Sequence, residues 1–198
     1  MGRFWTGCGA LAVLVLAGCS GGGGGGASAG FDPSDIGDLV LTENTASRVA
    51  GQVAVAGSGG LSFSATLDPA QGVLLKTDLL PGTPELDAPT AGSATMRGGF
   101  ALARARNAAE TGGTWDADLD SVTGDLTLTA RFGAGTLTGG GDGLTVNGRI
   151  AGDRLRGGVS YGGVAGDLDG IIGRRSAIGL FTATGSGEGY AGGFAVAR

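Results

Sequence analysis

Apolar and polar residues alternate along most of this chain, most clearly between Asp125 and Gly141. In the first half of that stretch four apolar residues stand at every second position, Leu126, Leu128, Ala130 and Phe132. A period of two places the apolar side chains on one face of a β-strand and the polar side chains on the other. The glycine-containing segment 133–135 then predicts a tight turn, with a return strand beginning at Thr136.

Similar alternation continues over the second half of the chain. The runs are 96–103, 115–120, 125–132, 144–150, 155–161, 168–172, 177–184 and 190–197. These are about eight strands with turn residues every 8–12 positions, a spacing typical of an antiparallel sandwich or barrel. We therefore expect an all-β fold with an eight-stranded antiparallel C-terminal β-barrel over residues 90–198. The last run is expected to close the sheet, because it would otherwise leave an open edge.

Residues 31–89 are expected to form a small β meander followed by a proline-rich link. Strands are predicted at 47–55 and 61–67, with a third at 73–75, whereas 31–43 shows no clean period. Prolines at 81, 84 and 89 interrupt regular structure. Three strands are about the minimum for stability, so the pattern leaves open whether this part folds independently.

The first thirty residues predict export and anchoring. An apolar stretch too short to span a bilayer follows Arg3, and Leu16-Ala17-Gly18-Cys19 resembles the lipobox of bacterial lipoproteins. Residues 1–18 are thus expected to be a lipoprotein signal peptide, with Cys19 carrying the lipid, palmitate included. Several acyl chains hold a protein on a membrane far better than one. The alternative is an ordinary signal peptide in which the cysteine is incidental.

The segment after Cys19 predicts a tether. Residues 19–30 contain six consecutive glycines, and such a segment has a reach of roughly 20 Å. Ser20, where an aspartate would suggest inner-membrane retention, favours the outer membrane. We expect a lipid-anchored outer-membrane protein, displayed on the cell surface or facing the periplasm.

The amino-acid composition argues against several classes of function. The net charge is −5 and there is no histidine. An acidic chain without basic clusters argues against nucleic-acid binding. Without histidine, the usual nucleophile–base pairs and the commonest zinc ligand are missing. We therefore expect neither an enzyme nor a cofactor.

Three carboxylates are the candidate metal ligands, Asp116, Asp118 and Asp120. An EF-hand loop would need glycine and glutamate where Ser121 and Thr127 stand, so that motif does not fit. The favoured interpretation is a solvated strand face, and no metal site is expected.

Other polar and aromatic residues have two interpretations each. Arg104 and Arg106 could hold an anionic ligand, but solubilising loop charges are favoured. Trp115 is expected to anchor the core, the alternative being an exposed binding aromatic.

The C-terminal half resembles a known family. The features are Pro89–Thr95 leading into a Gly-Phe strand, the hairpin Gly124–Gly139, and Gly179-Leu180-Phe181 followed by Ala191–Phe194. Their order is similar to that in the β-barrel domain of transferrin-binding protein B-like bacterial surface lipoproteins. The resemblance implies a barrel that binds a partner without catalysis, and it transfers no binding residue to this chain.

The predicted function is a lipid-anchored outer-membrane binding module with an unidentified ligand. The partners considered are the membrane through the lipid anchor, a host or envelope protein, and a small solute. A periplasm-facing barrel carrying a small apolar ligand and a purely structural envelope lipoprotein are the alternatives. The chain is expected to be a monomer.

Overall fold

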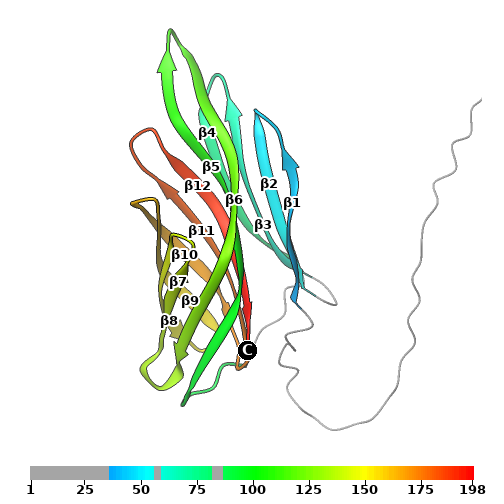
Figure 1. Cartoon of the computed structure of the whole chain (residues 1–198), viewed down its shortest axis with the longest axis vertical. Coiled ribbons are helices and arrows are strands. Elements are labelled where there is room, and N and C mark those ends of the chain that lie inside the picture. The colour runs from blue at the N-terminus through cyan, green and yellow to red at the C-terminus, as the bar shows by residue number, and fades with distance from the viewer. Residues whose placement is uncertain (1–35, 56–58, 82–86) are drawn as a thin grey trace, which may run out of the picture.

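The computed structural model describes residues 36–55, 59–81 and 87–198. It contains a four-stranded antiparallel sheet followed by a closed eight-stranded antiparallel barrel (Figure 1). This confirms the predicted all-β fold, with a β meander ahead of an eight-stranded barrel. In the described residues no helix has both the length and the apolar character needed to cross a membrane. The predicted signal peptide, the predicted lipidation site Cys19 and the predicted glycine tether lie outside the described residues.

The first sheet has the order β1-β2-β3-β4. Its strands are β1 (Ile36–Asn44), β2 (Arg48–Val55), β3 (Gly60–Asp68) and β4 (Gly72–Leu80). The sequence predicted the last three and missed β1. Two register shifts interrupt the pairing of β1 with β2, and such irregularities break the period of two that marks a strand.

The barrel closes in the order β10-β11-β12-β5-β6-β7-β8-β9. Its strands are β5 (Ser93–Thr111), β6 (Thr114–Arg131), β7 (Thr136–Gly141), β8 (Leu144–Ala151), β9 (Arg154–Tyr161), β10 (Val164–Ile172), β11 (Ser176–Thr184) and β12 (Gly189–Ala197). A short 3-10 turn at Phe132–Ala134 joins β6 to β7. The last strand, β12, pairs with both β11 and β5, as expected.

Side chains from all around the wall fill the barrel interior. Its buried set includes Phe100, Leu128, Phe181 and Phe194. Glycines on the strands admit large neighbours: a Cβ atom at Gly179 would lie 2.5 Å from ring atoms of Phe194, and one at Gly192 would lie 2.6 Å from Phe181. At these positions the space left by a missing side chain is occupied by an aromatic ring.

A second core lies outside the barrel, where the four-stranded sheet packs on the barrel wall. The sheet contributes Leu61 and Phe63, and the wall contributes Ala101 from β5, Leu180 from β11 and Ala191 from β12. Consequently β11 and β12 are buried along nearly their whole length on both faces.

At one end of the molecule, turns of the four-stranded sheet lie beside turns of the barrel (Figure 1). We call this the turn end and define it by the turns 45–47, 69–71, 112–113, 142–143, 162–163 and 185–188. The β5–β6 turn projects farthest there, at the top of Figure 1. The start of β1 and the C-terminus lie at the opposite end (Figure 1).

Candidate binding site at the turn end

The β5–β6 hairpin positions the candidate site. On β5 the pairing with β12 ends at Ala105, but β5 continues as far as Thr111. The outer part of the hairpin therefore extends beyond its neighbour in the barrel wall. Gly112 and Gly113 form its tip, and both have positive φ angles that favour glycine.

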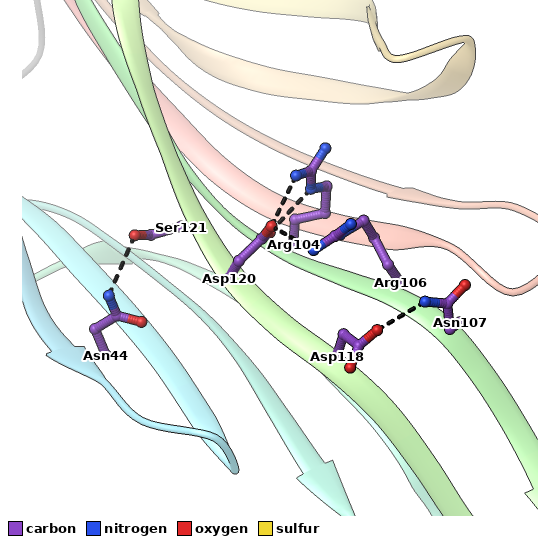
Figure 2. Close-up of polar contacts among 7 residues, drawn as sticks. All are labelled: Asn44, Arg104, Arg106, Asn107, Asp118, Asp120 and Ser121. Atoms are coloured by element: carbon purple, nitrogen blue, oxygen red, sulfur yellow. Dashed lines mark hydrogen bonds and ion pairs between the residues drawn. The ribbon is translucent and has the colours of Figure 1, made fainter.

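One face of the hairpin carries a cluster of charged and polar side chains (Figure 2). Arg104 donates two hydrogen bonds to Asp120, from Nε at 2.9 Å and from a terminal nitrogen at 2.7 Å. Arg106 contacts the same carboxylate at 3.1 Å. Farther toward the tip, the amide of Asn107 donates to Asp118 at 2.7 Å.

The expected roles of the arginines and of Asp120 were wrong. Arg104 and Arg106 are strand residues of β5, not loop charges. Asp120 is on the face of β6 that carries Leu126 and Leu128 into the barrel core, whereas Leu119 packs outward against the four-stranded sheet. In β6 near Asp120, the apolar side chains therefore pack into the second core. The acidic side chains lie on the face that, farther along the strand, lines the barrel interior.

The ion pair sets the protonation of its members. The hydrogen bonds from Arg104, more than its charge alone, hold the pKa of Asp120 below the usual value for a carboxyl. The same hydrogen bonds to Asp120 raise the pKa of Arg104. Arg104 also lies 5.9 Å from the centre of the Tyr161 ring, within the range of a cation–π contact.

An aromatic group closes the core beneath this cluster. Tyr161 packs edge to face against Tyr190, which in turn packs edge to face against Phe181. The Tyr190 hydroxyl donates to the carbonyl oxygen of Val164 at 2.8 Å, and burial raises the pKa of that hydroxyl.

The three candidate metal ligands do not converge. Asp120 accepts from Arg104, Asp118 accepts from Asn107, and the Asp116 carboxylate accepts from the backbone N–H of Ala117. Across the described ranges, no group of three or more His, Cys, Asp or Glu side chains is placed to hold a metal ion.

The other face of the hairpin borders a pocket of about 320 Å³. The half-buried Trp115 lines it together with Val73 and Leu75 of β4, and the β11–β12 turn contributes Glu188. The ring of Trp115 lies over Gly72, where a Cβ atom would come within 3.2 Å of it. The backbone N–H of Trp115 donates to the carbonyl of Pro69 at 2.9 Å. Trp115 thus joins the hairpin to the β3–β4 turn and also forms a wall of an open pocket.

The sequence held a signal for the arginine–aspartate cluster. Gly112-Gly113 is a turn dipeptide, and a hairpin folded about it brings Arg104 close to Asp120 on the paired strand. A register shift between Arg106 and Ala109 then places the two directly opposite. The prediction ended one strand at 103 and divided β6 into the runs 115–120 and 125–132, which hid the long hairpin and its pairing. No comparable signal marked the pocket, because its walls come from three hairpins that are distant in the sequence.

No protein-family model matches the chain, and no curated protein matches its sequence. Solved structures with similar folds do exist. The haemoglobin receptor HpuA of Kingella denitrificans is 18% identical over 68% of this chain and 54% of its own, with a TM-score of 0.39. In complex with human haemoglobin, HpuA gives 17% identity over 81% of this chain and 70% of its own, with a TM-score of 0.43.

Transferrin binding protein B from serogroup B Neisseria meningitidis is also similar. It is 12% identical over 81% of this chain and 34% of its own, with a TM-score of 0.48. The chain therefore spans about half the length of the first HpuA structure and about a third of this one.

Proposed function

We propose that this chain is a non-catalytic binding module, anchored to the outer membrane through Cys19 and presenting its turn end to a protein partner. The observation that carries the proposal is the pocket at the turn end, which residues of the β3–β4, β5–β6 and β11–β12 hairpins build together. The turns beside this pocket lie at the end of the molecule opposite the start of β1 (Figure 1). A lipid attached ahead of Ile36 would leave the pocket accessible from solution.

The pocket has the character of an interface anchor point. Tryptophan in a recessed, partly apolar setting is among the residues that contribute most to protein–protein binding. Val73 and Leu75 supply the apolar wall, and the exposed Glu188 supplies a charge at the rim. A volume of about 320 Å³ accommodates a partner's side chain against the indole ring rather than a large separate ligand.

The proposed partner is a protein, and the comparisons do not identify it. HpuA and transferrin binding protein B differ from this chain at more than four-fifths of aligned positions, and we propose neither haemoglobin nor transferrin as its partner. A small apolar ligand inside the barrel is not favoured, because aromatic rings occupy the space beside Gly179 and Gly192.

The proposal is tested on cells that express the full chain. An epitope inserted between Gly112 and Gly113 should be labelled by antibody on intact cells. Cells incubated with host serum, or with solubilised envelope proteins, should retain a protein after crosslinking. Substituting Trp115→Ala should reduce that retention at least tenfold, and Thr184→Arg, which fills the pocket from its rim, should do the same.

The control is Leu41→Ala, which truncates an exposed apolar side chain on β1, outside the residues that line the pocket. It should leave retention unchanged, and thermal unfolding should verify that each variant is folded. An epitope that is labelled only after the outer membrane is opened would contradict surface display. Equal retention by the wild type and the Thr184→Arg variant would contradict the pocket as the binding site.

A further inference from the structure

The four-stranded sheet has one regular open edge. In the described chain β4 pairs only with β3, and no backbone hydrogen bond joins residues 73–79 to any other strand. In an edge strand, every second residue points its backbone N–H and C=O groups away from the strand it already pairs with. These free groups can pair with an added strand. The β3–β4 register runs without a shift, whereas β1, at the other edge, pairs through two register shifts.

A groove runs beside this edge. It has a volume of about 480 Å³ and is lined by Thr77, Asp78 and Leu79 of β4 and by residues of β9, β10 and β11. A second hollow of about 310 Å³ shares Asp167 and Thr182 with it and continues along β10 and β11 to Ala165 and Thr184. The floor therefore covers β10 from 165 to 169, the length of about five extended residues or roughly 17 Å.

Carboxylates dominate the charge of the groove. Asp78, Asp167 and Asp169 line it, and all three are exposed. Arg156 is the single basic residue among the described lining residues, and it approaches Asp169 at 4.0 Å. Asp78 and Asp167 have no ion-pair partner within the described ranges.

The spacing of the floor carboxylates matches an added strand. Asp167 and Asp169 stand two residues apart on β10, so both side chains leave the same face about 7 Å apart. Alternate side chains of an extended peptide have the same separation. A strand that pairs with β4 can therefore direct basic side chains at successive odd positions toward Asp167 and Asp169.

We propose that the β4 edge is a docking site for an extended segment of a partner protein with basic residues at alternate positions, bound as a fifth strand of the sheet. The edge supplies backbone hydrogen bonds, which do not depend on the bound sequence, and the groove supplies the selection for positive charge. The groove beside β4 shares no lining residue with the Trp115 pocket, and the second hollow shares only Thr184 with it. The edge site is therefore tested at residues outside that pocket, and its failure is distinguishable from failure of the proposed function.

Synthetic peptides test the proposal with the full lipoprotein in detergent micelles. The probe is a fluorescein-labelled nine-residue peptide in which lysine and threonine alternate. Two comparison peptides have the same composition: one collects its lysines in a block, and the other keeps the alternation but is N-methylated at alternate backbone amides. Fluorescence anisotropy should give an affinity at least tenfold higher for the alternating peptide than for either comparison peptide.

Variants locate the site. Asp167→Asn with Asp169→Asn should weaken binding of the alternating peptide at least fivefold. The matched control, Asp116→Asn with Asp125→Asn, removes two exposed carboxylates from β6 and should change it less than twofold. Amide hydrogen exchange of residues 73–79 should slow when the peptide binds. Equal affinity for the N-methylated peptide, or equal weakening by both double variants, would show attraction by net charge alone and overturn the proposal.

Discussion

Asp120 shows how strongly the surroundings of a single carboxylate decide its role. It is 31% exposed and binds two arginines, whereas Asp116 on the same strand bonds only to the neighbouring backbone. Partly buried pairs that include charged hydrogen bonds contribute more than fully solvated ones. The Arg104–Asp120 pair is therefore expected to stabilise the part of the β5–β6 hairpin in which it lies.

Substituting Asp120→Asn should lower the free energy of unfolding by about 1 kcal/mol at neutral pH. The pKa of Asp120 is lower in the folded chain than in the unfolded one, so the stabilisation is complete above the unfolded pKa. It is lost as the pH falls through the folded pKa, and the two proteins should then converge in stability. Urea unfolding along a pH series measures this, with Asp125→Asn as the control. A pH-independent difference would contradict it.

Gly179 has no side chain, and the Phe194 ring occupies the space that a side chain would need. Substituting Gly179→Ala should destabilise the chain by about 2 kcal/mol, because the new methyl group must displace the Phe194 ring from the barrel core. The control is Gly133→Ala, where the nearest atom to the added Cβ lies 3.9 Å away and little change is expected. Thermal unfolding compares the two. If both variants lowered the unfolding temperature equally, the barrel core would be able to accommodate a methyl group at Gly179 without cost.

At the scale of elements, the alternation of apolar residues was sufficient to predict most of the fold. Leu126 and Leu128 marked β6 correctly, and Leu61 with Phe63 marked β3, because each strand has one buried face. The same reasoning placed Leu119 on an apolar face, but it could not show that this face packs against the four-stranded sheet and not into the barrel. It also missed β1, where the register shifts remove the period.

The docking of the sheet on the barrel could not be read from the sequence. Ala101 and Ala191 lie on the outer wall and are as buried as interior residues, but small side chains give no sign of which layer will cover them. The Trp115 pocket was beyond prediction for a related reason. It depends on where the β3–β4 turn lies relative to the hairpin, which packing of the second core determines.

Sheet and barrel should unfold together because they share that core. Leu61 is fully buried, and a Cβ atom at Gly193 of β12 would come within 2.6 Å of it. Substituting Leu61→Ala should cost 2–5 kcal/mol, within the usual range for a buried leucine, and leave a single calorimetric transition. Leu41→Ala, at an exposed site, should cost less than about 0.5 kcal/mol. Two transitions, of which Leu61→Ala lowers only one, would show independent folding.

At the scale of the whole molecule, the predicted anchor and the proposed binding surfaces lie on different parts of the chain. The two cysteines offer a matched pair of variants for the anchor, because Cys8 falls within the predicted signal peptide and Cys19 at the predicted lipidation site. The Cys8→Ala variant should remain in the outer-membrane fraction and incorporate labelled palmitate. The Cys19→Ala variant should lose both properties. Membrane retention of the Cys19→Ala protein would rule out anchoring through that sulfur atom.

The pairing of β12 with β5 has a consequence for biogenesis. Gly189 lies opposite Ala105, so the contact that seals the wall joins residues far apart in the chain, and such contacts form slowly. Until 189–197 has been synthesised, a nascent chain carries two long unsealed strands, β5 and β11. Unsealed strands recruit one another between molecules and aggregate. A chaperone that shields them until synthesis has passed Ala197 would therefore determine how much protein reaches its native state.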